Sequence, residues 1–520
     1  MTLSTLDAGI VLAYLAGLFV LAQWVSRERA GHHKSAQDYF LAGKALPWWA
    51  IGASLIAANI SAEQIIGMSG SGFAIGLAIA SYEWMAAVTL LIVAKYFLPI
   101  FLRNEIYTMP QFLERRYGGR IRTLMAVFWL GLYVFVNLTS ILWLGSLAIS
   151  YVSGIEQTTA LLALAAFALA YQIYGGLKAV ALTDVVQVTL LVLGGLLLVG
   201  IAMDRISDGA GVLAGFERLR TEVPGHFHMI LSPDHPFYKD LPGLSVLLGG
   251  MWVMNVSYWG FNQYIIQRAL AAKSLGEAQK GVLFAAFLKL LMPVIVVLPG
   301  LAAVLLAPDL ERPDAAYPAM MALLPAGVLG LVFAALIAAI VSSLASMTNS
   351  ISTIFTLDFY TRLGREHSQR QMVRVGRIAA VVAMVLAALA ARPLLGSFDQ
   401  AFQYIQEYTG FFTPGIVVIF LLGLFWKRAN EAGALAAAIG SFVLSVVLKL
   451  AWPALPFIDR VGLVFLLAAA LAVAVSLFTA RAGAKDFIRT DDVRYRTNAT
   501  FNLGALGVVA ITTALYAAFW

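Results

Sequence analysis

Residues 53–72 read ASLIAANISAEQIIGMSGSG, an apolar segment that small and polar residues interrupt near Asn59 to Ser61. The segment belongs to an apolar run over 47–70, which is long enough to cross a bilayer. The interruption predicts a helix that is broken near the middle of the membrane. Such a break frees backbone carbonyls and exposes half-helix ends, and these groups can coordinate an alkali cation and a polar solute.

Similar apolar runs follow one another along the whole chain. Of its 520 residues 61% are hydrophobic and 12% are charged, whereas about 25% are charged in ordinary soluble proteins. This composition excludes a soluble fold and indicates a multi-pass, all-α membrane protein. Because roughly 20 apolar residues cross the hydrocarbon core, we predict about fourteen transmembrane helices. The predicted spans are 6–25, 47–70, 76–101, 122–150, 157–174, 179–203, 244–270, 280–307, 328–361, 374–394, 399–426, 431–452, 461–480 and 500–520.

The connecting segments alternate between rich and poor in Lys and Arg. Because cytoplasmic loops carry the excess of basic residues, the rich set is predicted to be cytoplasmic, and both termini then lie outside. The first span lacks a basic segment before it and a small-residue cleavage site after it, so we predict a retained helix. The loop 204–243 contains three irregularly spaced histidines, which favour a solvated external loop over a metal site. No Cys occurs, which excludes disulfides and thiolate metal sites.

Ionisable and amide side chains lie inside several predicted spans, where each charge costs about 2.5–3.5 kcal/mol on insertion. They could tie helices together by hydrogen bonds, or they could line a water-filled cavity. Lys289 has no acidic neighbour in sequence, and it favours the cavity, as does Glu83. The serines Ser342 and Ser343 could pack within their own helix, or they could offer oxygen to a hard cation. The in-span residues are Glu83, Asp184, Lys289, Glu407, Gln64, Asn137, Asn255, Asn262, Gln403 and Gln406.

Five longer strings resemble the sodium/solute symporter family, and within it the bacterial sodium/galactose (sodium/glucose) cotransporters. They occur in order and cover nearly the whole chain. The strings are NISAEQIIGMSGSGFAIGLAIASYEWM (59–85), YGGLKAVALTDVVQV (174–188), SYWGFNQYIIQR (257–268), AAIVSSLASM (338–347) and FQYIQEYTG (402–410).

The resemblance implies a leucine-transporter-like core of two inverted five-helix repeats. It also implies that the protein is a symporter and not an enzyme. It further implies alternating access that carries a simple hexose such as galactose or glucose into the cell with sodium. The implied location is the cell (inner) membrane, and no nucleic-acid partner is expected. The implied parts are an extra helix and cytoplasmic loop over 1–46, the first repeat over 47–203, the external loop over 204–243, the second repeat over 244–427, and three C-terminal helices over 428–520.

Site residues are carried over from the same resemblance. The sugar site would comprise Gln64, Glu83, Asn255, Lys289 and Gln406, with Tyr258 stacked beneath the ring. Tyr258 would also be the inner gate, and the outer gate would comprise Met68, Tyr82 and Phe402. The sodium ligands would be the backbone carbonyls of Ala57, Ile60 and Ala339 with the hydroxyls of Ser342 and Ser343. Asp184 would lie on the sodium exit route, and Asn137 would contact the leaving sugar.

Two positions depart from the family pattern. Ala86 stands where galactose-transporting members have a serine, so the preferred hexose is left open. Ala345 replaces the hydroxyl residue of members with a second sodium site, so we expect one sodium per sugar. A charged solute such as an amino acid or sialic acid would require an Arg that the core spans lack, whereas inositol remains an alternative. A membrane enzyme or receptor is disfavoured, because no P-loop, hydrolase elbow or HExxH motif occurs.

Overall fold

The computed structural model describes residues 3–26, 46–106, 108–174, 177–362, 368–398, 400–479 and 493–520. The described residues form helices and no strand, apart from an isolated bridge between Leu46 and Ala272. The prediction of an all-α protein is therefore confirmed.

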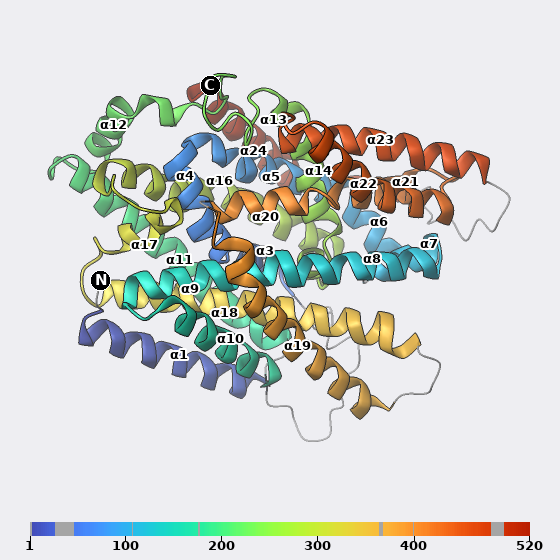
Figure 1. Ribbon diagram of the computed structural model, residues 1–520, viewed down its shortest axis with the longest axis horizontal. Coiled ribbons are helices and arrows are strands. Elements are labelled where there is room, and N and C mark those ends of the chain that lie inside the picture. Colours follow the sequence, from blue (N-terminus) through green and yellow to red (C-terminus); the bar gives the residue numbers. More distant parts are fainter. Residues whose placement is uncertain are drawn as a thin grey trace.

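Nine helices of the described residues are long and apolar enough to cross a membrane. Two further pairs of helices, each bent at a short break, are long and apolar enough when the two helices of a pair are taken together. The helices run largely along one common direction (Figure 1). The predicted count of fourteen spans stays a prediction. The nine helices are η3 to α6 (Leu77–Arg103), α8 to α9 (Gly119–Ser153), Val185–Ile206 within α11 (Leu177–Ile206), α16 (Leu275–Leu306), α18 with η9 (Val328–Phe359), Gln371–Leu395 within α19 (Gln369–Leu395), α22 (Glu431–Ala451), α23 (Phe457–Phe478) and α24 (Ala499–Ala518).

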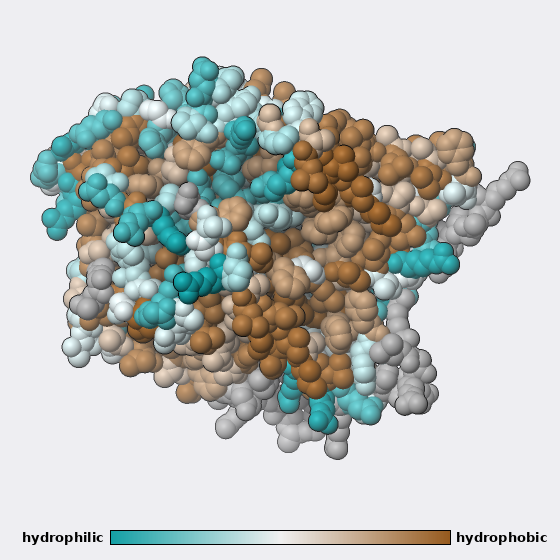
Figure 2. Space-filling model, viewed as in Figure 1, coloured by the Kyte–Doolittle hydropathy of each residue, from teal (hydrophilic) through white to brown (hydrophobic). Residues whose placement is uncertain are grey.

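The remaining elements complete the bundle and its ends. Both termini lie in the half of the molecule that holds α12 (Figure 1), and hydrophilic side chains gather over that end while a broad apolar zone extends beside it (Figure 2). The other elements are α1 (Thr5–Ser26), α7 (Met109–Arg116), α10 (Gln157–Tyr174), α12 (Val212–Glu222), η6 (Pro224–Phe227), α13 (Ser245–Leu248), α14 (Gly250–Val256), α15 (Gln263–Leu270), η8 (Pro313–Ala315), α17 (Ala316–Met321) and η10 (Tyr360–Arg362).

The predicted break in the second span is confirmed. Helix α3 (Trp48–Asn59) ends at Asn59, Ile60 is extended, and the segment Glu63–Ile75 continues at an angle of 64°. A second bent pair joins α20 (Ala401–Thr409) to α21 (Thr413–Phe425) at 44°. Because a helix end leaves its last carbonyls without intrahelical partners, each break exposes polar backbone inside the bundle.

Five π-helical segments interrupt the described helices. Such segments are rare and occur frequently at functional sites. Three of them carry residues that the sequence analysis singled out: Gln64 in η2, Asn137 in η5 and Tyr258 in η7. The segments are η2 (Glu63–Gly67), η4 (Val93–Phe97), η5 (Tyr133–Leu138), η7 (Ser257–Phe261) and η9 (Phe355–Phe359).

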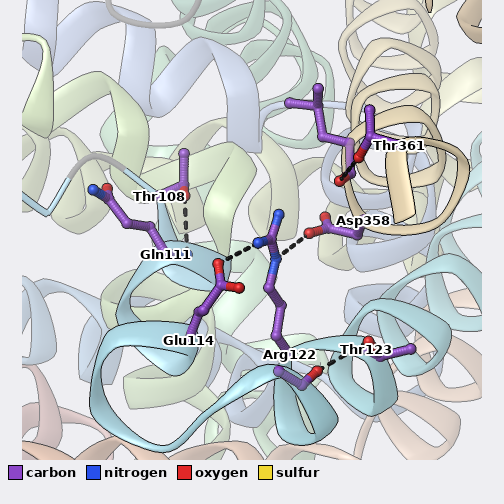
Figure 3. A network of polar contacts seen from close by, with 9 residues as sticks. Thr108, Gln111, Glu114, Arg122, Thr123, Asp358 and Thr361 are labelled. Carbon is purple, nitrogen blue, oxygen red and sulfur yellow. Dashed lines mark hydrogen bonds and ion pairs between the residues drawn. The ribbon is translucent and has the colours of Figure 1, made fainter. Parts of the chain in front are cut away.

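An ion-pair network joins the hairpin of α7 and α8 to the end of α18. The guanidinium of Arg122 lies between the carboxylates of Glu114 on α7 and Asp358 on η9 (Figure 3). Arg116 also donates to the carbonyls of Gly423 and Trp426, both at 2.9 Å, at the end of α21. The hairpin therefore connects two helices that are far apart in the sequence.

Close approach of α16 to α4 (Met68–Ile75) depends on Gly300. A Cβ at this position would lie 2.1 Å from the carbonyl oxygen of Ser69. We expect Gly300→Ala to lower the melting temperature of the detergent-solubilised protein by several degrees, because overpacking costs about 1–3 kcal/mol. Gly131→Ala is the matched control, since its added Cβ has no described atom within 4 Å other than the neighbouring backbone of its own helix. Equal melting temperatures for the two variants would contradict the close packing.

Candidate functional site

A cavity lies where the two broken helices meet α5 (Ser81–Ile92), η5, η7 and α16. About 890 Å³ of its space is free of protein atoms, including the part that opens to solvent. Ten of the in-span polar residues and predicted site residues line it together. They are Gln64, Tyr82, Glu83, Asn137, Asn255, Tyr258, Asn262, Lys289, Phe402 and Gln406.

A buried ion pair forms one wall of the cavity. The Nζ of Lys289 lies 2.5 Å from Oε2 of Glu83, and both side chains are at most 3% exposed. The same Nζ donates to Oδ1 of Asn59 and lies 4.9 Å from the ring centroid of Trp259. These partners satisfy the charge inside the membrane and leave a wall that offers both donors and acceptors.

A series of hydrogen bonds leads from Asn59 and Tyr258, which line the cavity, to Tyr264. The amide nitrogen of Asn59 donates to the hydroxyl of Tyr258 at 3.2 Å, and that hydroxyl lies 2.8 Å from the hydroxyl of Tyr264. Tyr264 in turn donates to the carbonyl of Ala58 at 2.8 Å. The ring of Tyr258 is therefore fixed by hydrogen bonds at its edge, next to the end of α3.

Several polar atoms of the lining have no hydrogen-bond partner within the described part of the chain. They include Oε1 of Glu63, Oε1 of Gln64, the hydroxyl of Tyr82 and the hydroxyls of Thr409 and Thr413. Buried polar groups are normally paired, and an unpaired one costs free energy. These atoms are therefore available to a ligand that carries several hydroxyl groups, or to water.

Two aromatic side chains of the cavity lining pack on each other. The rings of Tyr82 and Phe402 pack edge to face with centroids 5.1 Å apart, and both side chains are buried. Met68 is completely buried and does not line the cavity, so no contact with the cavity supports its predicted role as a gate. Ala86 does line the cavity, at the position where a serine would have offered a hydroxyl.

The five predicted sodium ligands lie at the break of α3 and in the middle of α18. Ala57, Ile60, Ala339, Ser342 and Ser343 are all at most 8% exposed. Helices α3 and α18 contact each other, and Oγ of Ser343 has no hydrogen-bond partner among the described residues. Carbonyl and hydroxyl oxygens of this kind form the all-oxygen shell that a hard cation prefers.

Some predicted and some additional residues need separate mention. The side chain of Asp184 lies outside the described residues. Asn59 and Trp259 both contact the ammonium group of Lys289, and neither of them was predicted to have a role in the site. The position of Asn59 directly before the predicted helix break could have indicated its role in the site. Nothing in the sequence could have indicated the role of Trp259, because it is an aromatic residue in an apolar span.

Asp240 lies in the loop before α13. Burial and the nearby carboxylate of Glu407 raise the pKa of Asp240 to about 6. A raised pKa stabilises the folded state at low pH, and that contribution is lost as pH rises through about 6. Because the ordinary pKa of Asp is 3.8, the contribution is lost between that value and about 6, so we expect Asp240→Asn to raise the melting temperature at pH 7.5 and to raise it less at pH 5. Equal shifts at both pH values would contradict this assignment.

The profile of the sodium:solute symporter family matches residues 39–441. The sodium/glucose cotransporter of Vibrio parahaemolyticus is 50% identical, over 100% of this chain and 99% of that protein. The sodium/myo-inositol cotransporter 2 of Homo sapiens is 34% identical, over 85% of this chain and 69% of that protein.

Two solved structures share the fold. A sodium-coupled sialic acid symporter, in a substrate-bound outward-open state, has a TM-score of 0.76 at 24% identity and covers 93% of this chain and 99% of its own. The transporter Mhp1, closed with bromovinylhydantoin bound, has a TM-score of 0.54 at 14% identity and covers 87% of this chain and 98% of its own. The expected leucine-transporter-like architecture is therefore confirmed.

Proposed function

The chain belongs to the sodium:solute symporter family and is a sodium-coupled membrane transporter, not an enzyme, and from this premise we propose that it carries a hexose such as glucose or galactose into the cell. The observation that carries the proposal is the wall formed by Lys289, Glu83 and Asn59, beside amide and hydroxyl oxygens that have no hydrogen-bond partner among the described residues. A sugar hydroxyl both donates and accepts, so it fits a wall that does the same. No Arg lines the cavity within the described part of the chain, which disfavours an anionic solute.

The proposed sugar site comprises Gln64, Glu83, Asn255, Lys289 and Gln406, with Tyr258 beneath the ring. Phe402 and Tyr82 would close the outer side together with Met68, and Tyr258 would close the inner side. The apolar C–H face of a pyranose packs well on an aromatic ring, which supports the position of Tyr258. Asn137 would contact the leaving sugar.

The proposed sodium site joins the break of α3 to α18. Sodium would draw together the carbonyls of Ala57, Ile60 and Ala339 and the hydroxyls of Ser342 and Ser343, and it would leave past Asp184. Coupling requires that each ligand binds the outward-facing and inward-facing states with different affinity. Separating α3 from α18 would remove the sodium shell and alter the sugar site, because Asn59 at the end of α3 holds both Lys289 and Tyr258.

One sodium per sugar is sufficient for accumulation. One charge crossing 100 mV yields about 2.3 kcal/mol, and a tenfold sodium gradient adds about 1.4 kcal/mol. These terms together support roughly 500-fold accumulation of a neutral sugar.

The proposed topology has fourteen spans with both termini outside, in the cell membrane. The location of both termini in the half that holds α12 supports an even number of spans (Figure 1). The core would consist of the repeats 47–203 and 244–427, with the loop 204–243 between them and three further helices in 428–520.

The test is uptake of radiolabelled glucose and galactose into proteoliposomes, with a sodium gradient set against a matched potassium gradient. We expect accumulation only with sodium. Myo-inositol is the second candidate, because its cotransporters are 34% identical to this chain, and it is measured in the same assay. Sodium-dependent uptake of inositol alone would disprove the hexose proposal.

A further inference from the structure

The short helix α20 carries two residues of the proposed site. Its nine residues, Ala401–Thr409, include Phe402 and Gln406, which lie one turn apart and both line the cavity. A bend of 44° separates it from α21. A helix this short cannot hold its own position by backbone hydrogen bonds alone, so its contacts with neighbouring elements, including those at its two ends, fix where Phe402 and Gln406 lie.

The start of α20 is held by a buried carboxylate. Oδ2 of Asp314, on η8, accepts a hydrogen bond from the backbone nitrogen of Ala401 at 3.0 Å. Asp314 is 3% exposed. This bond fixes the first turn, which carries Phe402.

The other end of α20 is held by two cations on one carboxylate oxygen. Oε1 of Glu407 lies 3.0 Å from a guanidinium nitrogen of Arg460 and 3.0 Å from Nζ of Lys449. The side chain of Arg460 is 5% exposed and that of Glu407 is 25% exposed. Ion pairs with limited access to water are screened less than surface pairs, so this contact resists displacement of the helix.

Aromatic rings surround the same charges. Nζ of Lys449 lies 4.8 Å from the ring centroid of Tyr408, and the guanidinium carbon of Arg460 lies 5.1 Å from that of Phe411. The two rings stack on each other with centroids 5.8 Å apart. The cations therefore contact the bend between α20 and α21 as well as the carboxylate, and they fix its orientation.

Both cations come from outside the proposed ten-helix core. Lys449 lies in the last turn of α22, and Arg460 lies in the first turn of α23. On α20, Glu407 directly follows Gln406, and successive residues of an α-helix point about 100° apart. The helix can therefore direct Gln406 into the cavity while Glu407 contacts α22 and α23.

We propose that Glu407 is a positioning residue for the transported solute: its ion pairs with Arg460 and Lys449 hold α20 so that Gln406 reaches the cavity and Phe402 packs on Tyr82. This inference rests on the proposed sugar site. It gives the C-terminal helices α22 and α23 a part in substrate recognition. Without the ion pairs α20 samples other positions, so the protein binds the solute more weakly while its sodium site, on α3 and α18, is unchanged.

The experiment compares Glu407→Gln with the wild type in proteoliposomes, using whichever solute the wild type carries with sodium. We expect the half-saturating solute concentration to rise by about tenfold, with the half-saturating sodium concentration and the maximal rate changed by less than about twofold. Glu222→Gln is the matched control, because its carboxylate pairs with Arg218 at 2.7 Å in α12, on the exposed surface. It should leave all three quantities unchanged.

A charge exchange separates positioning from mere stability. Glu407→Arg combined with Arg460→Glu should recover part of the solute affinity that Glu407→Arg alone loses. An unchanged half-saturating solute concentration in Glu407→Gln would overturn the proposal. So would a lower maximal rate with unchanged solute affinity and a lower melting temperature, since that result describes a structural role only. If the wild type carries a solute other than a hexose, the hexose proposal fails while the role of Glu407 is still decided on that solute.

Discussion

Proteoliposomes that contain Lys289→Ala are expected to accumulate at least about 100-fold less sugar than the wild type. Removing one partner of a buried ion pair leaves the other charge uncompensated, which costs about 3–5 kcal/mol. In this protein the remaining charge would be Glu83, whose carboxylate lies 2.5 Å from Nζ of Lys289. Asn59 would lose the hydrogen bond that it accepts from Lys289. Uptake under a sodium gradient measures the effect.

A double variant distinguishes loss of the site from loss of the fold. Lys289→Ala with Glu83→Gln removes both charges, so it should recover most of the melting temperature and none of the transport. Lys95→Ala is the matched control, since Lys95 also lies in a membrane helix but faces the ring of the exposed Tyr96 at 5.4 Å. Normal uptake by Lys289→Ala would show that the pair is not part of the sugar site.

Removing the hydroxyl of Ser343 is expected to raise the half-saturating sodium concentration by about tenfold, which corresponds to about 1.4 kcal/mol. Oγ of Ser343 is buried without a hydrogen-bond partner in the described structure, so Ser343→Ala breaks no internal bond there. The double variant Ser342→Ala with Ser343→Ala should lose sodium-stimulated uptake altogether. Initial rates at a series of sodium concentrations give the half-saturating values.

Ser346→Ala provides the control for this series, because it makes the same substitution about one turn further along α18. It should leave the half-saturating sodium concentration unchanged. Sugar affinity of Ser343→Ala, measured at saturating sodium, should remain close to that of the wild type. If Ser343→Ala kept the sodium response of the wild type, the cation would have to bind elsewhere.

Much of this architecture could be predicted from the sequence. Apolar runs predicted the all-α membrane fold, and the polar residues near Asn59 predicted the break between α3 and Glu63. The costly in-span residues Glu83, Lys289 and Gln406 do line one cavity. These predictions succeeded because unpaired polar groups are costly in lipid. A polar residue within an apolar span therefore indicates a partner or a water-filled cavity.

The pairing of these groups could not be predicted, because it depends on the packing of distant segments. Glu83 and Lys289 are 206 positions apart in the sequence, and Glu407 and Arg460 are 53 apart. Periodicity and composition do not tell how close together residues so far apart in the sequence lie in the folded protein. The π-helical segments were also missed, since a single additional residue in a helical turn leaves the apolar pattern almost unaltered.

The π-helical segments have a consequence for how this chain tolerates insertions and deletions. Segment η5 connects α8 to α9 (Thr139–Ser153) within one continuous helix. Because a π-helical turn holds one residue more than an α-helical turn, η5 accommodates an additional residue while α8 and α9 keep the faces that they present. Deleting one residue of Tyr133–Leu138 would convert the segment to α-helix and leave those faces unchanged, whereas deleting one residue within α9 would rotate everything beyond it by about 100°. The π-helical segments are therefore the places in these helices where a change of one residue in length is absorbed.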